Sequence, residues 1–423
     1  MAGADLTTLS NILKEYYLGP VAEQLNNEVL LLNRLDSRSE DLVGKYAYVP
    51  LHYGRNGGIG AVGEGDTLPS AGNQSYYRAK YDLKYLYGRV QVTGPSMAKT
   101  KNEAGAFLQA LKSELDGLRN DLRKDLARQV YGDGTGVIAQ AAAASAVSGN
   151  IVTLASAEPI KKGQLYAGMS IDVFAYSSNA KTSSVTTSIT AVDAATPSIT
   201  VADATGIANS DYIARAGAVG SQLNNATGTR SYEIDGIKRI VSTSATDLGE
   251  VAVSTYSWWD NKRLTGDLDP ETAGTQHTLS LDLIQKAMNT VRLEGANPSL
   301  IVTTLGIQRE FYNLLSQDVQ YIDPASLSYA AGFKTLSYNG MPLVADIDAP
   351  YGKMYILDES TLKVFSDQDW HFLDADGQTL RQKTDKDAFE AIMVRYMNLG
   401  ATKRNNQLVI DDIYVDGAAD AGV

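Results

Sequence analysis

The residue types that most often carry acid–base, nucleophilic or metal chemistry are scarce in this chain of 423 residues. It contains no cysteine, which excludes disulfides, cysteine nucleophiles and thiolate metal ligands. Its three histidines, His52, His277 and His371, lie far apart in the sequence. Histidine is the usual proton carrier near neutral pH and the commonest metal ligand. The composition therefore predicts a non-enzymatic protein, with no catalytic residue, metal or cofactor.

One stretch matches a binding motif by letter alone, and a serine-rich stretch lacks the motif that catalysis would need. Residues 58–63, GIGAVG, have the spacing of a dinucleotide-binding loop, which needs a helix directly after the glycines. The residues that follow, GEGDTLPSAGNQS, cannot begin a helix, so we interpret this stretch as a flexible loop tip. The serine- and threonine-rich residues 139–230 contain no GxSxG sequence and no histidine that could activate a serine.

Paired aspartates occur in DADG at 374–377 and at Asp411–Asp412. A calcium loop needs several further oxygen ligands at regular spacing, and DADGQT lacks them. Asp and Gly favour tight turns, which explains the first pair without a ligand. We therefore expect no metal ion at either pair.

The charge balance and the hydropathy limit the partners. The formal net charge is −12, whereas tight binding to nucleic acid relies on Lys and Arg to displace counterions. The chain could enclose DNA without gripping it. The N-terminus lacks the basic flank and apolar core of a signal peptide, and no run of ~18 apolar residues occurs. We expect no membrane partner, a cytoplasmic site of assembly, and two or three compact units for this length.

Two segments have helical periodicity. Residues 1–44 have a narrow apolar stripe that is interrupted at Pro20, which is typical of an arm that lies on another surface. Residues 104–131 have a long apolar stripe opposite a charged face, and at 1.5 Å per residue they predict a helix roughly 40 Å long. Thr100 and Glu103 have the spacing of a capping box just before it.

A long hairpin is predicted between the arm and the helix. Residues 45–53 have strand character, and in residues 76–93 Tyr77, Tyr81 and Tyr85 alternate with charged residues. The glycine-rich stretch between the two segments provides a wide tip. An isolated two-stranded ribbon is marginal in water, so we expect this hairpin to dock on a neighbouring subunit.

The rest of the chain mixes helices and strands. Residues 139–230 contain short alternating runs separated by turns, which predicts an inserted small β-barrel or sandwich. Residues 278–294 predict a helix, residues 299–304 a buried strand, and Asn339–Gly340 a tight hairpin turn. There is no regular βαβ rhythm, so the predicted fold class is α+β.

The long helix ends in RQVYGDGTG, residues 128–136. A long amphipathic helix that ends in a GDG-type turn resembles the spine helix of the major capsid proteins of tailed double-stranded DNA phages, the Hong Kong 97 type. GEGDTLPSAG with the tyrosine-rich strand resembles the return of the extended loop in that family, and FEAIMVRYMNLGATKRNNQLVI resembles its closing strands. The order of the parts agrees over nearly the whole chain except residues 139–230.

This resemblance implies an α+β Hong Kong 97-type capsid fold with a β-rich insertion domain. The implied parts are an N-terminal arm (1–44), an extended loop (45–95), the spine helix and start of the peripheral domain (96–138), the β-rich insertion domain (139–230), the continuation of the peripheral domain (231–295), the axial domain (296–370) and the closing strands of both domains (371–423).

The implied function is self-assembly, through hexamers and pentamers, into the icosahedral head shell around the packaged double-stranded DNA. The implied location is the virion, assembled in the bacterial cytoplasm, and the implied partners include a portal and, in some relatives, a decoration protein. Only 103 residues precede the long helix, so we expect a separate scaffolding protein rather than a fused one. The alternatives are an encapsulin-type shell, another phage component such as a fibre or tail protein, and, less in keeping with the composition, an α+β enzyme.

The extended loop is the predicted subunit interface. The residues that we expect to lie there are Arg55, Glu64, Asp66, Tyr77, Tyr81 and Tyr85. Some relatives join a loop lysine to an asparagine of a neighbour by an isopeptide bond. Lys80 or Lys84 with Asn405 or Asn406 would be the pairs here, but no local motif marks them, and we expect no covalent cross-link.

Overall fold

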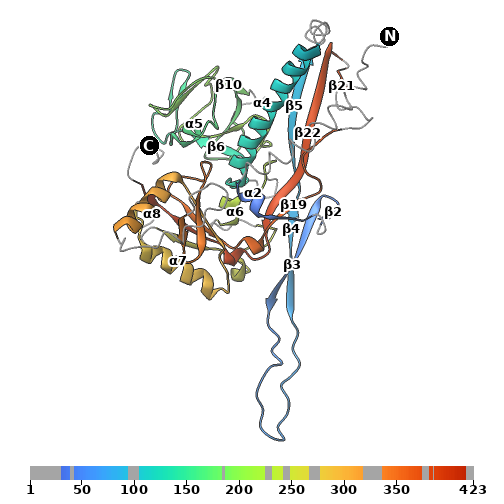
Figure 1. The fold of residues 1–423 in the computed structure, drawn as a ribbon, viewed down its shortest axis with the longest axis vertical. Coiled ribbons are helices and arrows are strands. Elements are labelled where there is room, and N and C mark those ends of the chain that lie inside the picture. The colour runs from blue at the N-terminus through green and yellow to red at the C-terminus, as the bar shows by residue number, and fades with distance from the viewer. Residues whose placement is uncertain are drawn as a thin grey trace.

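The computed structural model describes residues 30–38, 42–93, 104–182, 186–223, 231–241, 248–265, 277–317, 336–373, 381–383 and 385–415. Most of the predicted arm, the predicted capping box and the DADG pair lie outside the described residues. The predicted α+β class is confirmed: a long central layer, a curled sheet and a mixed sheet with two helices make up the described part (Figure 1).

The central layer is built on one long antiparallel pair of strands. β5 (Lys84–Thr93) pairs with β22 (Ala388–Ala401) along its full length, although about 300 residues separate them in sequence. Helix α4 (Ala104–Val130), which confirms the predicted helix, lies against β5 (Figure 1). Gly88 makes this close approach possible, since a Cβ there would lie 2.7 Å from the Leu122 side chain. The other strands of this sheet are β1 (Asp36–Arg38), β19 (Leu362–Ser366), β20 (His371–Phe372) and β21 (Arg381–Gln382).

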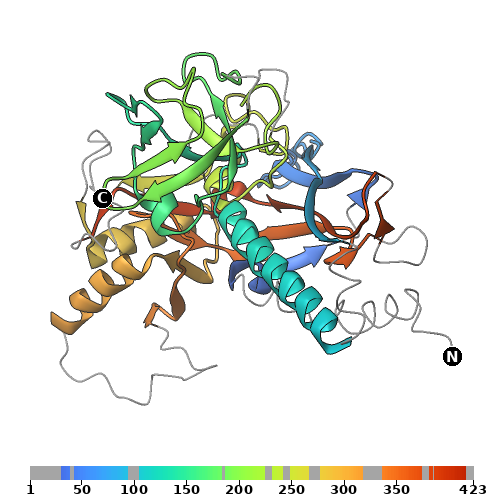
Figure 2. The same ribbon diagram turned by 90° about the horizontal axis from the view of Figure 1, so that it is seen from above.

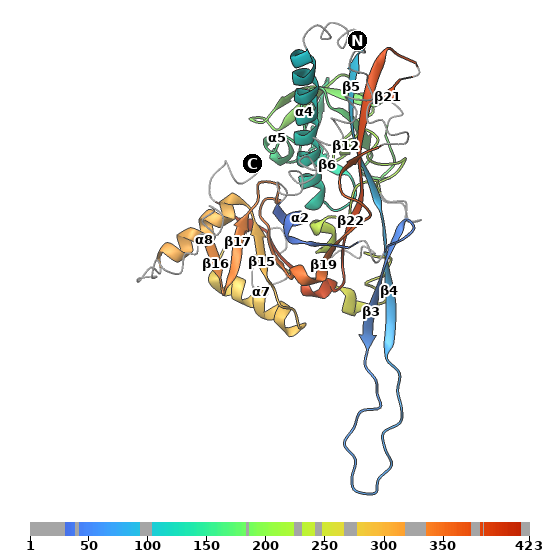
Figure 3. The same ribbon diagram turned by 45° about the vertical axis from the view of Figure 1, so that its right-hand side comes forward.

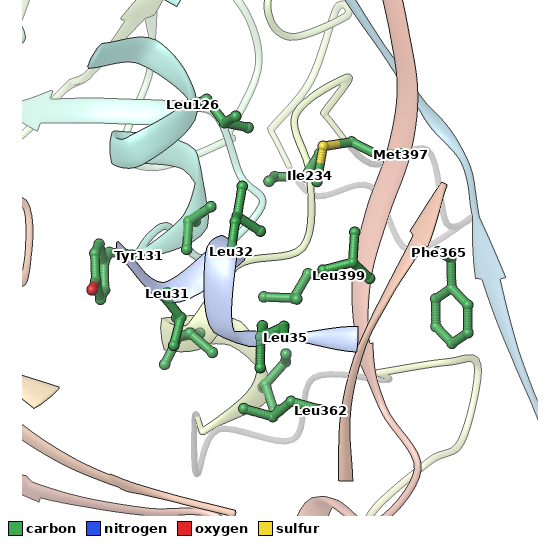
Figure 4. Close-up of a cluster of buried hydrophobic side chains, with 14 of the residues drawn as sticks. Leu31, Leu32, Leu35, Leu126, Tyr131, Ile234, Leu362, Phe365, Met397 and Leu399 are labelled. Carbon is green, nitrogen blue, oxygen red and sulfur yellow. The ribbon is translucent and has the colours of Figure 1, made fainter. Parts of the chain in front are cut away.

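The largest hydrophobic core joins this layer to the start of the described chain. Helix α2 (Leu30–Arg34) places Leu31 and Leu32 in the core, and Leu35 follows it there. Figure 4 shows these three leucines among side chains from α4, β19 and β22. The core therefore requires segments from both ends of the sequence.

The predicted hairpin is present, but only in part as expected. β3 (Tyr46–Gly54) pairs with β4 (Ser75–Asp82), and β2 (Leu42–Val43) adds a third, short strand. The second predicted segment, residues 76–93, allowed one strand or two, and the structure has two. Leu83 separates β4 from β5, and only β4 belongs to the hairpin.

The described part of residues 137–223 forms a curled sheet, which we call the insertion sheet. Its strand order is β6-β12-β9-β10-β11-β8-β7, and a bridge between Ala141 and Leu154 brings β6 back to β8. The sheet encloses its own hydrophobic core. Its elements are β6 (Val137–Gln140), β7 (Val147–Ser148), β8 (Ile151–Thr153), α5 (Glu158–Lys161), β9 (Ser170–Phe174), β10 (Thr187–Asp193), β11 (Ser198–Val201) and β12 (Tyr212–Arg215).

A mixed sheet with two helices forms the third part. Helices α7 (Leu281–Leu293) and α8 (Leu305–Gln317) share one core with one face of the sheet, while side chains of the other face join the largest core. Ser280 caps α7 by accepting a hydrogen bond from the Leu283 amide. The strands of the mixed sheet, in order, are β13 (Lys262–Thr265), β23 (Leu408–Asp411), β18 (Met354–Leu357), β15 (Leu300–Thr303), β17 (Met341–Ala345) and β16 (Leu336–Tyr338).

The remaining described elements are short. The predicted turn at Asn339–Gly340 joins β16 to β17, and both residues have positive φ, +51° and +81°. The other short elements are α6 (Ile237–Ile240), β14 (His277–Thr278), β24 (Ile413–Tyr414) and the 3-10 turns Ser257–Trp259, Glu359–Thr361 and Arg404–Asn406. Among the described helices, none is both long enough and apolar enough to span a membrane.

Figure 2 shows how the parts meet. The C-terminal end of α4 lies near the centre of the molecule, close to both the insertion sheet and the layer of α7 and α8. The hairpin projects away from these parts and extends well beyond the rest of the described chain (Figures 1 and 3).

Candidate assembly surfaces

The most exposed aliphatic side chains of the hairpin lie on its tip, residues 55–74. Ile59 is 84% exposed, Leu68 77% and Val62 45%. The tip has no strand and stands away from the body of the subunit, so among the described residues nothing beyond the loop itself covers these side chains (Figure 3). Large apolar side chains held out on a projecting element are typical of an interaction site.

Three of the predicted interface residues lie on the tip. Arg55, Glu64 and Asp66 are all exposed on the loop. Asp66 accepts a hydrogen bond from the Gly63 amide at 3.1 Å, which shapes the end of the loop. The tip therefore combines apolar side chains with charges of both signs.

The tyrosines predicted for the same interface are separated by the structure. Tyr81 is 0% exposed: its hydroxyl donates to the Ala401 carbonyl at 2.7 Å and accepts from the Ala401 amide at 3.2 Å. Assigning it to an interface was wrong, because both its ring and its hydroxyl are used inside its own chain. Tyr77 is partly buried against Tyr256, with ring centroids 4.7 Å apart.

Tyr85 lies on the opposite side from Tyr81. Leu83 interrupts the alternation between β4 and β5, so the buried positions of β5 are Lys84, Leu86, Gly88 and Val90. Tyr85 is 48% exposed on the face that turns away from α4. The three alternating tyrosines therefore do not share one face, because a one-residue shift moves every later side chain to the other face.

This shift creates an aromatic surface that the sequence pattern did not reveal. Tyr87 is 58% exposed beside Tyr85, and Tyr396 of β22 makes edge-on contacts with both rings at 6.4 and 5.1 Å. His371 completes the group at 6.4 Å from Tyr396. We call these four residues the tyrosine face. The pairing of β22 with β5 on one side and with β20 on the other brings them together.

A network of charged groups lies where α4 meets the other parts. The Arg128 guanidinium donates to both carboxylate oxygens of Glu233, at 2.5 and 3.0 Å, and to Asp125 at 3.1 Å. Burial alone would raise the pKa of Asp125, but Arg128 and Arg215 outweigh it and lower that pKa below its usual value. The network holds the C-terminal end of α4 to residues 231–235 and to the insertion sheet.

A second group of acids lies nearby, and one of them, Asp348, has its pKa shifted in the opposite direction. The Tyr131 hydroxyl donates to Asp346 at 2.7 Å. Burial, together with the neighbouring Asp346, raises the pKa of Asp348. Lys162 of the insertion donates to the Ala349 carbonyl and to Glu158, both at 2.6 Å. These contacts join the insertion to the loop between β17 and β18.

The groups considered for cross-linking and metal binding have partners in their own chain. The Lys84 ammonium is buried and donates to the Ser231 carbonyl, and Lys80 pairs with Glu250. Asn406 is buried and donates to Asp358. Asp411 pairs with Arg263 and Lys353. Within the described part of the chain, no three acidic or histidine side chains are close enough together to hold a metal ion.

The fold is similar to that of a solved phage capsid structure. The capsid asymmetric unit of cyanophage A-1(L) matches 90% of this chain and 92% of its own, with a TM-score of 0.55 and 15% sequence identity. The described chain therefore has the α+β fold of a phage capsid protein. No family model and no curated protein matches the sequence.

Other solved structures match over similar lengths with lower scores. The capsid of a native GTA particle matches 92% of this chain and 91% of its own, with a TM-score of 0.45 and 9% identity. The holo-SrpI encapsulin complex from Synechococcus elongatus PCC 7942 matches 92% of this chain and 89% of its own, with a TM-score of 0.46 and 9% identity.

Proposed function

We propose that this chain is the major capsid protein of a tailed double-stranded DNA phage and that many copies assemble into the icosahedral head shell. The observation that carries the proposal is the hairpin, which holds Ile59, Val62 and Leu68 away from the body of a chain that has a capsid-protein fold. A subunit that exposes these side chains on a projecting hairpin needs a neighbour to cover them.

The tip supplies both energy and register. Burying an isoleucine or leucine side chain contributes roughly 1.5–3 kcal/mol, so Ile59 and Leu68 provide most of the attraction. Exposed ion pairs contribute only about 0–1 kcal/mol each. Arg55, Glu64 and Asp66 therefore select the correct alignment more than they strengthen it.

The rest of the assembly belongs to the same proposal. The parts of the subunit would be the arm, extended loop, spine helix, insertion, peripheral domain and axial domain, assembled as hexamers and pentamers in the virion. A separate scaffolding protein, a portal, a decoration protein in some shells, and packaged DNA would be the partners. The net charge of −12 suits a container that encloses DNA without gripping it.

A structural rather than catalytic role agrees with the placement of the histidines. His52 contacts Gln74 at the base of the tip, and His371 belongs to the tyrosine face. His277 lies in the short strand β14, which pairs with β24. No two of them come from one site, so they offer no shared acid–base centre.

The direct test is electron microscopy of particles purified from cells that produce the full-length chain with its neighbouring phage genes. Closed shells that contain DNA support the proposal. Closed shells that contain a protein cargo instead would favour the encapsulin-type alternative, and small soluble oligomers would contradict both.

A matched pair of variants tests the role of the tip. Replacing both Ile59 and Leu68 with Ser should leave the circular dichroism of the subunit unchanged and abolish stable shells. The control is Val192→Ser, which changes an exposed valine of the insertion sheet. Shells of the double variant that are as heat-stable as those of the parent would show that the tip is not part of the interface.

A further inference from the structure

The hairpin is held in two different ways along its length. Near the body, its inner face is buried in the largest core through Val49, Leu51 and Ala79. Beyond Gly54 and Ser75 no strand continues. We call the part between these two regions, around Tyr53 of β3 and Tyr77 of β4, the root of the hairpin. One separate segment, residues 248–259, contacts both strands there.

The contacts on the face of the root are aromatic. Trp258 stacks on Tyr53 of β3, with ring centroids 5.0 Å apart and planes 3° apart. Tyr256 contacts Tyr77 of β4 at 4.7 Å and Tyr53 at 6.0 Å. Flat aromatic side chains with two rotatable bonds restrain each other well when they stack.

The contacts along the edge of β4 are polar. The Lys80 amide donates to the Gly249 carbonyl at 2.9 Å, and the Lys80 ammonium pairs with Glu250 at 2.8 Å. Gly249 has a φ of +65°, and a Cβ there would lie 2.9 Å from the Ala79 Cβ, so this turn is pressed against the strand. Trp259 is buried in the largest core, which anchors the segment in the subunit, and its indole nitrogen donates to the Leu248 carbonyl of the same segment at 3.1 Å.

We infer that residues 248–259 form a brace that fixes the direction in which the hairpin leaves the subunit. A ribbon of so few strands has little stiffness of its own, but here it is restrained on one face by stacked rings and along one edge by hydrogen bonds. The role of the brace in assembly rests on the proposed function. The tip is the part that reaches the neighbour, so the brace that directs it also sets the angle between neighbouring subunits. Tyr53, Tyr256 and Trp258 are then positioning residues for assembly.

Because the chain contains no cysteine, its hairpin direction can be measured with two engineered labels. Thr67→Cys on the tip and Leu293→Cys at the end of α7, both exposed positions, take spin labels in the full-length, unassembled subunit. Double electron–electron resonance should give one narrow distance peak. Tyr53→Ala should cause the loss of that narrow peak, whereas Tyr53→Phe, which retains the ring, should keep it.

Two further variants guard against a trivial result. Trp258→Ala removes the same stack from the side of the brace and should also lose the narrow peak. Tyr76→Ala removes an exposed tyrosine of the same hairpin, beside His52 rather than the brace, and should keep it. An unchanged peak in both Tyr53→Ala and Trp258→Ala would overturn the brace, and so would an equal loss in Tyr76→Ala.

Assembly is measured separately on the same variants without labels. Tyr53→Ala should give particles of mixed diameter or open sheets, and Tyr53→Phe should give uniform shells. Uniform shells from Tyr53→Ala would overturn the role of the brace in assembly. If the parent chain forms no shell at all, the proposed function fails, while the distance measurement still decides whether the brace exists.

Discussion

The central layer and the insertion sheet reach stable structures by different routes. The core of the central layer combines residues from Leu31 to Val409, so it cannot close until both ends of the described chain are in place. The core of the insertion sheet lies entirely within Ala139 to Ile213. Local cores form early and independently, whereas cores with long sequence separation depend on the whole chain. We therefore expect the insertion sheet to fold as a unit of its own and the central layer to lack this independence.

Among the described residues, a few polar contacts join the insertion sheet to α4 of the central layer and to the mixed sheet. Arg215 of β12 pairs with Asp125 of α4 at 3.5 Å. Lys162 and Glu158 hold the loop between β17 and β18, with the Tyr351 amide donating to Glu158 at 3.2 Å. We therefore expect two unfolding transitions in urea, one for each region, and the following changes should act on them unequally.

The largest effect is expected from Arg128→Met, in the central layer. This change leaves the Glu233 carboxylate buried without its cation, and breaking a buried ion pair in this way typically costs about 3–5 kcal/mol. The free energy of unfolding of the central layer should fall by that amount, as measured by the fluorescence of its tryptophans. The transition of the insertion sheet should move much less.

An exposed pair in the same layer provides the control. Arg89 and Glu390 pair across β5 and β22, but Arg89 is about half exposed. Arg89→Met should cost only about 0–1 kcal/mol. Adding Glu233→Leu to Arg128→Met should recover much of the loss. If the double variant is as unstable as the single one, the buried carboxylate is not the cause.

The next effect is expected inside the insertion sheet. Ile171→Ala removes a fully buried side chain of its core and should cost about 2–5 kcal/mol. Ile151→Ala, at a position that is 47% exposed, is the matched control and should cost far less. Circular dichroism across a urea series should show that only the insertion transition moves. A matching fall in the central layer would mean that the two regions unfold as one unit.

The difference between the regions also explains what the sequence could predict. Helix α4, the strands of the insertion and the turn at Asn339–Gly340 follow from periodicity and turn residues that lie close together in the chain. The pairing of β5 with β22 has no such local signal. The single-residue break at Leu83 was equally hard to see, since tyrosine continues to alternate on both sides of it.

The candidate site divides in the same way. The exposed tip could be predicted because a glycine-rich loop between two strands has few ways to be buried. Tyr81 was assigned to the wrong environment because its partner, the Ala401 backbone, is 320 residues away. The tyrosine face was missed because Tyr85 and Tyr396 become neighbours only through the long β5–β22 pair.

A smaller effect is expected from Lys162→Met, at the junction of the two regions. The change removes the donor to Glu158 and to the Ala349 carbonyl, and hydrogen bonds from charged donors contribute about 1.5–3 kcal/mol. The gap between the two unfolding transitions, measured as the difference between their urea midpoints, should widen because the contact that couples them is lost. Lys238→Met, which removes a half-exposed partner of Asp133, is the control and should leave the gap unchanged.

The smallest effect is expected from pH. Its effect on stability should have opposite signs in the insertion sheet and at the junction. In the insertion, burial would raise the pKa of Asp172, but Lys181, Thr186 and the Gly217 amide outweigh burial and lower it. The stability that Asp172 contributes is present above the ordinary carboxyl pKa and is lost as pH falls through the lowered one. At the junction, burial and Asp346 raise the pKa of Asp348. Its contribution is complete below the ordinary pKa and is lost as pH rises through the raised one.

Urea titrations between about pH 3 and pH 7 separate these two contributions. Asp172→Asn should flatten the acid loss of the insertion transition, because the group that takes up the proton is gone. Asp348→Asn mimics the protonated acid, so it should stabilise the junction near neutral pH and remove its dependence on pH there. If either substitution changes the pH dependence of the other region's unfolding transition, protonation in one region is coupled to the stability of the other. The independence of the insertion sheet would then hold only for its apolar core.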